Sequence, residues 1–179
     1  DELPMQIGNP TLEREEAASS LLVNLGLQEV ITYRMTSPER EARLNPSGAV
    51  DDVESYVRIA NPIAGDRNVL RRSLLSSVLE VVERNTLQRD RMMLFEIGPV
   101  FDVVPNEALP RESLRLAIAI TGPREETSWQ GGDSSPMDFF DLKGILQAFA
   151  DGLHLGQFQY VPMEQSSFHP GKCARMAVN

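Results

Sequence analysis

The chain has 179 residues, of which 41% are hydrophobic, and this suffices for one ordinary domain with a sizeable core. Its formal net charge of −9 argues against a protein that binds nucleic acid on its own, because neutralising phosphates requires a basic face. No stretch approaches the roughly 20 apolar residues of a membrane-spanning helix, Asp1-Glu2 is no signal peptide, and the single Cys173 fits a reducing cytoplasm.

The first third of the chain predicts short elements. Residues 1–10 are rich in proline and glycine and are expected to form an incoming linker. From Thr11 the apolar residues recur with helical spacing, and Gly26 follows as a C-terminal stop. Residues 28–34 favour a strand. The capping-box spacing and the proline in 36–44 predict a short helix there.

The middle of the chain should carry the longest helix and the central strand. After a loop at 45–53 and a strand near 56–60, we expect a helix from about Asp66 to Leu87. Its apolar face consists of Leu70, Leu74, Leu75, Val78, Leu79, Val81 and Val82. The run 92–101 is apolar almost throughout, which is typical of a strand buried on both faces.

The last third alternates strands with one more helix. Residues 114–121 alternate between apolar and other residues, as a half-buried strand does. Residues 122–137 form a long loop, 142–153 an amphipathic helix, and 157–163 and 173–178 two strands. Because strands and helices do not alternate regularly, the pattern predicts an α+β fold with an antiparallel sheet rather than a doubly wound one.

No residue set predicts catalysis or a metal site. His154 and His169 have no cysteine or carboxylate at zinc-ligand spacing. Asp138 and Asp141 stand where acidic residues cap a helix, which we favour over a catalytic role. Cys173 has no histidine at catalytic spacing, and no glycine-rich phosphate loop is present.

Five short segments, in order along the chain, resemble the synthetase-like core domain of the phenylalanyl-tRNA synthetase β subunit family. They are GLQEVITY at 26–33, NPIAGDRNVLRRSLL at 61–75, LFEIGPVF at 94–101, DFFDLKG at 138–144 and FHPGKCA at 168–174. The segments are distributed over nearly the whole chain, from residue 26 to residue 174. Two departures are Pro99, in place of a commonly basic residue, and Ser76-Ser77, in place of Pro-Gly.

The resemblance implies a class II aminoacyl-tRNA synthetase-like antiparallel sheet flanked by helices, over residues 11–179. The third motif of class II enzymes would lie beyond Asn179, so we expect the fold to be incomplete at the C-terminus. The second motif reads Phe-Arg-x-Glu in active enzymes, where the arginine holds the ATP α-phosphate. Here the strand with Glu96 ends in Phe101, Asp102 and Val104, so the resemblance implies a degenerate motif and a catalytically silent domain.

The resemblance also implies partners. The family forms an (αβ)₂ assembly in the cytoplasm, with the aminoacylation site in the α subunit and with ATP, magnesium and tRNA bound by the whole enzyme. For this chain alone we expect no cofactor, no membrane and no DNA. The expected docking face for the α subunit comprises Asn61, Pro62, Leu70, Arg71, Arg72, Leu74, Leu75 and Leu79. The alternative is a nucleotide-binding or enzymatic domain with a divergent class II-like pocket.

Overall fold

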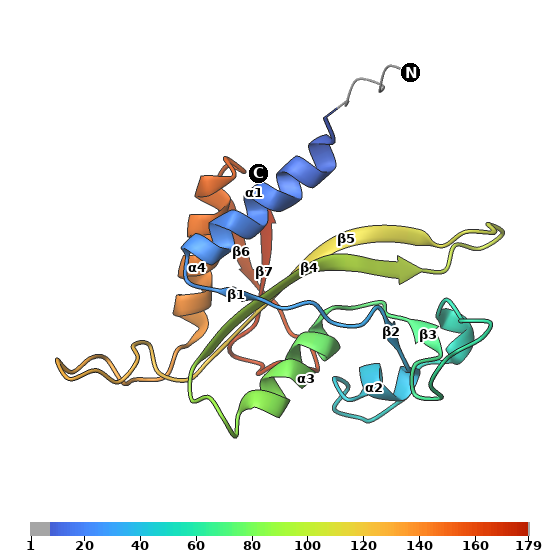
Figure 1. Ribbon diagram of the computed structural model, residues 1–179, viewed down its shortest axis with the longest axis horizontal. Coiled ribbons are helices and arrows are strands. Elements are labelled where there is room, and N and C mark those ends of the chain that lie inside the picture. The colour runs from blue at the N-terminus through green and yellow to red at the C-terminus, as the bar shows by residue number, and fades with distance from the viewer. Residues whose placement is uncertain (1–7, 179) are drawn as a thin grey trace, which may run out of the picture.

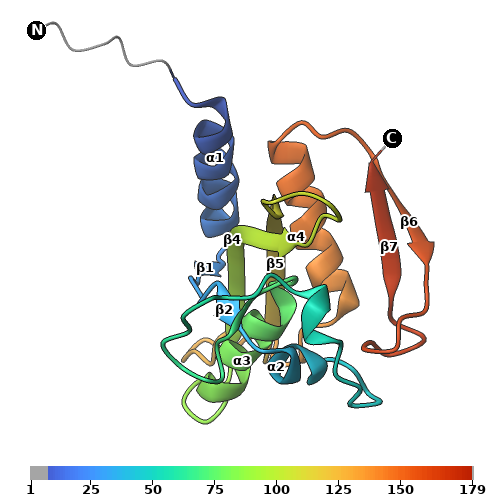
Figure 2. The same ribbon diagram turned by 90° about the vertical axis from the view of Figure 1, so that its right-hand side faces the viewer.

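The computed structural model describes residues 8–178, and its centre is a three-stranded sheet in the order β1-β4-β5 (Figures 1 and 2). Strand β1 is Gln28–Glu29, β4 is Met92–Asp102 and β5 is Arg111–Thr121. The long pair β4–β5 is antiparallel, whereas the short β1 runs parallel to β4. The predicted α+β class and the central position of the 92–101 strand are confirmed.

Helices cover both faces of this sheet. Helices α1 (Pro10–Asn24) and α4 (Phe139–Gly152) lie on one face, and α3 (Leu75–Asn85) lies on the other (Figure 1). On the first face, Leu22, Leu27 and Phe95 form a buried cluster against which Ile145 and Phe149 of α4 pack. Because successive side chains of a strand point to opposite faces, Glu96 lies on the α3 side.

Helix α1 begins one residue earlier than its pattern predicts. Pro10 is its first residue, and the Asn9 side chain accepts hydrogen bonds from the backbone of Thr11 and Leu12. Proline suits a first helical position, because its missing N–H would be unpaired there in any case. Residues 1–7 of the expected linker lie outside the described residues.

The predicted helix from Asp66 to Leu87 is wrong in its first half. Strand β3 (Val69–Leu70) pairs there with β2 (Met35–Thr36), and α3 starts only at Leu75. The backbone N–H group of Leu70 donates to the Val57 carbonyl, and that of Arg71 donates to the Arg34 carbonyl. Because these groups pair with extended segments, they do not form helical hydrogen bonds. Helix α3 therefore keeps only the C-terminal part of the predicted apolar face.

Two predicted strands are shorter than expected. In 28–34 only Gln28–Glu29 and the Val30 N–H bond to β4. In 56–60 a 3₁₀ turn, η1 (Val53–Ser55), precedes a single bridge from Arg58 to Val69. The predicted short helix is α2 (Pro38–Ala42), capped by Ser37.

The C-terminal predictions are confirmed. Asp138 caps α4, and β6 (Phe158–Pro162) forms an antiparallel hairpin with β7 (Ala174–Val178). The loop between β5 and α4 doubles back as an arm, held by Arg124 N–H donating to the Ser135 carbonyl and Glu125 N–H donating to the Asp133 carbonyl. Within residues 8–178, no helix combines the length and the apolar character that spanning a membrane requires.

Candidate functional site

The first three of the five resembling segments meet in a buried ion pair beneath α3. The Arg71 Nη1 atom lies 2.7 Å from Glu96 Oε1, and the two side chains are only 1% and 2% exposed. Thr32 completes the cluster: its hydroxyl donates to Glu96 Oε2 at 2.7 Å and accepts from Arg71 Nη1 at 2.8 Å. Arg71 Nε also donates to the Pro99 carbonyl at 2.9 Å.

Gly98 lets the arginine reach this position. A Cβ atom on Gly98 would lie 2.5 Å from Arg71 Nη2, which is closer than side-chain carbons approach. The buried charges are thus paired and hydrogen-bonded, as low-dielectric surroundings require. This ion pair joins the 26–33, 61–75 and 94–101 segments and is structural.

The position of Arg71 corrects its expected role. We predicted that Arg71 belongs to the docking face, but its side chain is enclosed and cannot reach another subunit. Leu74 is likewise buried, and Leu70 lies in β3 rather than on a helix. Arg72 forms its contacts within the chain: Nη1 lies 3.2 Å from Asp51 Oδ2, and the guanidinium lies over the Tyr56 ring.

Other residues of the predicted face are accessible. Asn61 and Pro62 lie exposed in the loop before β3, and Leu75 is half-buried at the start of α3. Leu79 is 38% exposed and lines a hollow with Arg43 and Glu83. Beside α3, in a shallow hollow shared with Ser77 and Val81, the structure adds Ile31 and Tyr33, which the sequence pattern assigned to a strand.

We call the accessible apolar residues Leu75, Leu79, Ile31 and Tyr33 the α3 face, which consists of two patches. Leu79 lies in a hollow beside Ser76 and Glu83, and Ile31 and Tyr33 lie in another hollow beside Ser77 and Val81. Ile31 is 90% and Tyr33 65% exposed, although Arg67 covers one side of the Tyr33 ring at 4.0 Å. Residues 31–33 are extended, so successive side chains point in opposite directions. Thr32 points inward to the buried Glu96, and Ile31 and Tyr33 on either side of it therefore point outward. The sequence offered no sign of this, because the segment resembles an ordinary strand.

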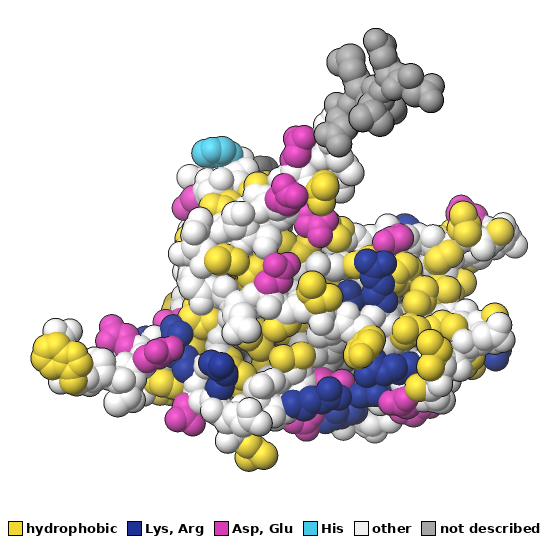
Figure 3. Space-filling model, viewed as in Figure 1, with side chains coloured by type: hydrophobic (Ala, Val, Ile, Leu, Met, Phe, Trp, Pro, Cys, Tyr) yellow, Lys and Arg dark blue, Asp and Glu magenta, His cyan; other side chains and the backbone are white. Residues whose placement is uncertain are grey.

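Ion pairs lie between and beside the two patches of the α3 face, because Arg40 and Glu80 line both hollows. Arg40 bonds to Glu80 and Asp66, and Arg43 bonds to Glu83 at 2.8 Å. Figure 3 shows a band of basic side chains in the region of α2 and α3, with apolar side chains above it. Charged residues therefore separate the two apolar patches.

The strand predicted to carry a degenerate second motif, β4, ends at Asp102. Its carboxylate lies 3.1 Å from Arg111 Nη2, across the β4–β5 pair. A hollow of about 320 Å³ beside it is lined by the carboxylates of Glu41, Asp51 and Asp102. Burial raises the pKa of Glu41, although the backbone N–H groups of Arg72 and Ser73 oppose this. Arg72, the basic residue of this hollow, is already paired with Asp51.

The N-terminus of α4 has the predicted caps. The Asp138 carboxylate accepts from the Phe140 N–H at 2.8 Å, and Asp141 accepts from the Asp138 N–H at 2.7 Å. Arg124, from the base of the arm, bonds to Asp141 at 2.9 Å. These contacts hold the pKa of Asp141 below its ordinary value, first through the bond from Arg124 and then through the Asp138 N–H.

We expect the Asp141→Asn change to lower thermal stability at neutral pH only. A carboxyl whose folded pKa is depressed contributes stability above its unfolded pKa, about 3.9, and loses it as the pH falls through the folded value. Melting temperatures between pH 7 and about pH 2 measure the effect, and the two proteins should converge at the acidic end. Asp151→Asn, at the other end of α4, is the control. A difference that persists unchanged in acid would contradict an ionic contribution.

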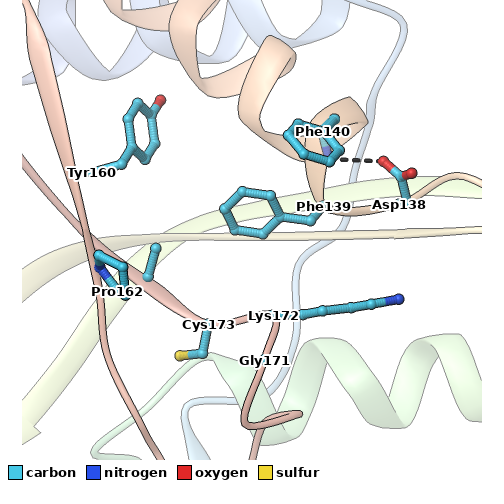
Figure 4. A pocket seen from close by; sticks show the side chains of 9 residues that line it. Asp138, Phe139, Phe140, Tyr160, Pro162, Gly171, Lys172 and Cys173 are labelled. Carbon is cyan, nitrogen blue, oxygen red and sulfur yellow. Dashed lines mark hydrogen bonds between the residues drawn. The ribbon is translucent and has the colours of Figure 1, made fainter.

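The last two resembling segments meet at a cavity of about 510 Å³ between α4 and the β6–β7 hairpin. Figure 4 shows Phe139 pointing from the start of α4 into the space between Tyr160 and the turn that carries Lys172 and Cys173. The lining residues are Asp138, Phe139, Phe140, Tyr160, Pro162, Gly171, Lys172, Cys173 and Ala174. The cavity therefore unites residues 138–144 with residues 168–174.

The two histidines lie apart from these sites. His154 follows α4 with a positive φ of 55°, and its N–H donates to the Asp151 carbonyl. His169 Nδ1 accepts from the Gly171 N–H at 3.1 Å, which stabilises the turn before β7. Among residues 8–178, no three or more His, Cys, Asp or Glu side chains are grouped so that they could hold a metal ion.

Solved structures with the same arrangement define the fold class. A pyrrolysyl tRNA synthetase from Desulfitobacterium hafniense matches 85% of this chain and 49% of its own, with a TM-score of 0.63 and 17% identity. A histidine–tRNA ligase subunit from Alicyclobacillus acidocaldarius matches 90% and 44%, with a TM-score of 0.57 and 16% identity. The chain therefore has a class II aminoacyl-tRNA synthetase-like fold.

Sequence comparison identifies the family within this class. The profile of the phenylalanyl tRNA synthetase beta chain CLM domain matches residues 2–179, and the chain belongs to this family. A phenylalanine–tRNA ligase beta subunit from Syntrophotalea carbinolica is 35% identical over 154 residues, 85% of this chain and 19% of that protein. The Bacillus subtilis beta subunit is 31% identical over 172 residues, 95% of this chain and 21% of that protein. The chain thus spans about a fifth of these relatives.

Proposed function

We propose that the chain is a non-catalytic structural domain of the β subunit of a cytoplasmic phenylalanine–tRNA ligase, and that it packs against the α subunit in an (αβ)₂ assembly. The whole assembly would attach phenylalanine to its tRNA with ATP and magnesium, and the tRNA would contact the whole enzyme. The observation that carries the proposal is the α3 face, two exposed apolar patches on a domain whose family is that of a β chain.

The composition of this face supports protein docking. Ile31, Tyr33 and Leu79 are exposed large apolar side chains, and leaving them in water is unfavourable. The ion pair of Arg40 with Glu80 lies between the two patches, and that of Arg43 with Glu83 lies beside Leu79, so the surface combines apolar and charged residues, as protein interfaces do. Asn61 and Pro62 are accessible and remain within the proposed interface, as do Leu75 and Leu79.

We expect Leu79→Glu to weaken the complex of the full-length β subunit with its α partner. A charge placed in a desolvated interface should weaken the binding free energy by at least about 2 kcal/mol, the scale of interface hot spots. This corresponds to roughly a thirtyfold loss of affinity. Co-expression followed by a binding titration of the two purified subunits measures the change.

Leu87→Glu is the matched control. Leu87 is exposed just after the end of α3, outside the proposed face, so the same substitution there should leave affinity unchanged. Circular dichroism of each β variant verifies folding. A folded Leu79→Glu subunit that binds α as tightly as the wild type would show that α3 is not the interface.

The region of Asp102 supports a catalytically silent role. A negative residue at the place of the phosphate-binding arginine repels a triphosphate, and Asp102 is already paired with Arg111. The adjoining hollow adds the carboxylates of Glu41 and Asp51. The alternative, a nucleotide-binding domain with a divergent pocket, lacks an unpaired basic residue at this hollow.

We therefore expect no measurable ATP binding by this chain. Calorimetric titration with ATP and magnesium should give no saturable heat, which limits any dissociation constant to about 1 mM or weaker. Phenylalanine-dependent pyrophosphate exchange should also be absent. The assembled ligase, titrated in the same buffer, serves as the positive control. Binding at micromolar affinity with 1:1 stoichiometry would instead support the nucleotide-binding alternative.

A further inference from the structure

The arm between β5 and α4, residues 122–137, presents a tryptophan to solvent at its tip. Trp129 is the only tryptophan of the sequence, and its side chain is 92% exposed. Figure 1 shows the arm extending away from the rest of the domain. Trp129 therefore adds nothing to the core of its own domain, whereas tryptophan is among the residues that contribute most to protein interfaces.

Hydrogen bonds hold the arm in shape at its base and at its tip. At the base, Arg124 Nε lies 2.9 Å from an oxygen of Asp141, which fixes the arm to the N-terminus of α4. At the tip, Ser128 Oγ donates to the Gly131 carbonyl at 2.7 Å, and the Gly131 N–H donates to the Ser128 carbonyl at 3.1 Å. The turn that these bonds close carries Trp129. An arm ordered in this way presents its side chain at a reduced entropic cost of binding.

The cavity between α4 and the β6–β7 hairpin suits an uncharged aromatic ring. Its volume of about 510 Å³ falls within the roughly 300–1,000 Å³ of pockets that bind organic groups. Phe139 and Tyr160 provide aromatic walls, and Ala174 contributes a small apolar side chain from β7. The lining includes one acidic residue, Asp138, and one basic residue, Lys172, so it favours neither sign of charge.

The arm and the cavity are placed so that two copies of the chain can exchange arms. The cavity lies at the base of the arm, because its lining begins at Asp138, directly after the arm. Trp129 is six residues beyond Pro123 at that base, which places the tip up to about 20 Å away at roughly 3.3 Å per extended residue. Two arms that lie side by side in opposite directions therefore bring each tip to the cavity of the other copy. The tip residues 127–132 are uncharged, as this cavity requires.

We propose that Trp129 of a second copy of this chain occupies the cavity and packs against Phe139 and Tyr160. The exchange is reciprocal across a two-fold axis. Because one chain supplies both halves of the contact, a single two-fold operation fills both cavities, as in the isologous interfaces of symmetric dimers. The contact joins two copies of this chain, so it is separate from the α3 face and goes beyond the function proposed above.

Photo-cross-linking from position 129 identifies the occupant. The photoreactive residue p-benzoylphenylalanine replaces Trp129 in one full-length β subunit, which is co-expressed with α and with a second, differently tagged copy that keeps Trp129. We expect a product that carries both tags, attached within residues 138–144 or 158–174 of the second copy. Leu87, 96% exposed after the end of α3, takes the same photoreactive residue as the matched control and should give no such attachment.

Substitutions in the second copy test the cavity itself. Ala174→Phe fills part of the cavity and should lower the two-tag yield at least about fivefold, because it builds a clash against the incoming ring. Ala177→Phe is the matched control, since Ala177 is exposed on the opposite face of the same strand and its substitution should preserve the yield. Circular dichroism verifies that each variant is folded. If Ala174→Phe does not fold, the position of the attachment decides alone.

Three results would overturn the proposal. They are attachment to α or to another part of the same subunit, a two-tag yield from position 129 no higher than from position 87, and a yield that a folded Ala174→Phe copy leaves unchanged. None of them depends on whether Leu79→Glu weakens the α–β complex, so the two proposals fail separately.

Discussion

Replacing Phe95 by alanine should lower the free energy of unfolding by about 3–5 kcal/mol, the usual range for truncating a buried aromatic side chain. Phe95 is 0% exposed and contacts Leu22 and Leu27 in the cluster under α1 and α4. It also lies on the central strand, where its register partner is Ile118 of β5. The truncation therefore opens a cavity. The strands on both sides of β4 and the helices above it prevent the surrounding structure from filling that cavity.

Urea or guanidinium unfolding, followed by circular dichroism, measures this loss. Phe140→Ala is the control, because Phe140 is exposed on the same side of the molecule and its truncation should change stability by no more than about 0.5 kcal/mol. If Phe95→Ala costs less than about 1 kcal/mol, the 92–102 strand is not the centre of the core.

The central sheet was predictable because its strands have strong local patterns. The apolar run 92–101 indicates burial on both faces, and the structure places β4 between β1 and β5. The alternation in 114–121 predicts a half-buried strand, and β5 has no second neighbour among the described residues. The Asp138 cap and the helix after it were predictable for the same reason, since a capping side chain bonds to backbone only a few residues away.

The first half of the 66–87 helix was not predictable from periodicity. Leu70 and Leu74 have helical spacing, but the backbone at 69–71 bonds to residues 34–36 and 57, far away in sequence. The buried pair with Glu96 then fixes Arg71 in an extended segment. A pattern of side chains along one segment carries no information on such partners, so tertiary contacts overrode the local preference.

The sequence indicated which segments form the candidate sites, but not which of their residues meet in space. The resemblance to the family indicated segments 26–33, 61–75 and 94–101. The structure shows that each segment contributes one residue to a single ion-pair cluster, namely Thr32, Arg71 and Glu96. Segments 138–144 and 168–174 likewise meet at one cavity. The exposure of Ile31 and Tyr33 was missed, because it depends on β1 ending after two paired residues.

The Arg71–Glu96 pair should produce the other large effect. Arg71→Met leaves the Glu96 carboxylate 2% exposed without its cationic partner. Removing one member of a buried pair costs about 3–5 kcal/mol, because the remaining charge keeps its desolvation penalty. The loss of the bond from Arg71 Nε to the Pro99 carbonyl adds to this effect. We therefore expect Arg71→Met to lower the free energy of unfolding by at least about 3 kcal/mol.

The double variant Arg71→Met, Glu96→Leu separates the pair from the packing around it. If the penalty of Arg71→Met comes from the stranded carboxylate, then removing that carboxylate restores much of the lost stability, since apolar replacements of buried pairs are often neutral. Unfolding free energies of the wild type, both single variants and the double variant form a complete cycle. We expect the double variant to be more stable than Arg71→Met alone. Losses that simply add would show that the two side chains stabilise the domain independently, and that the pair does not join the three segments.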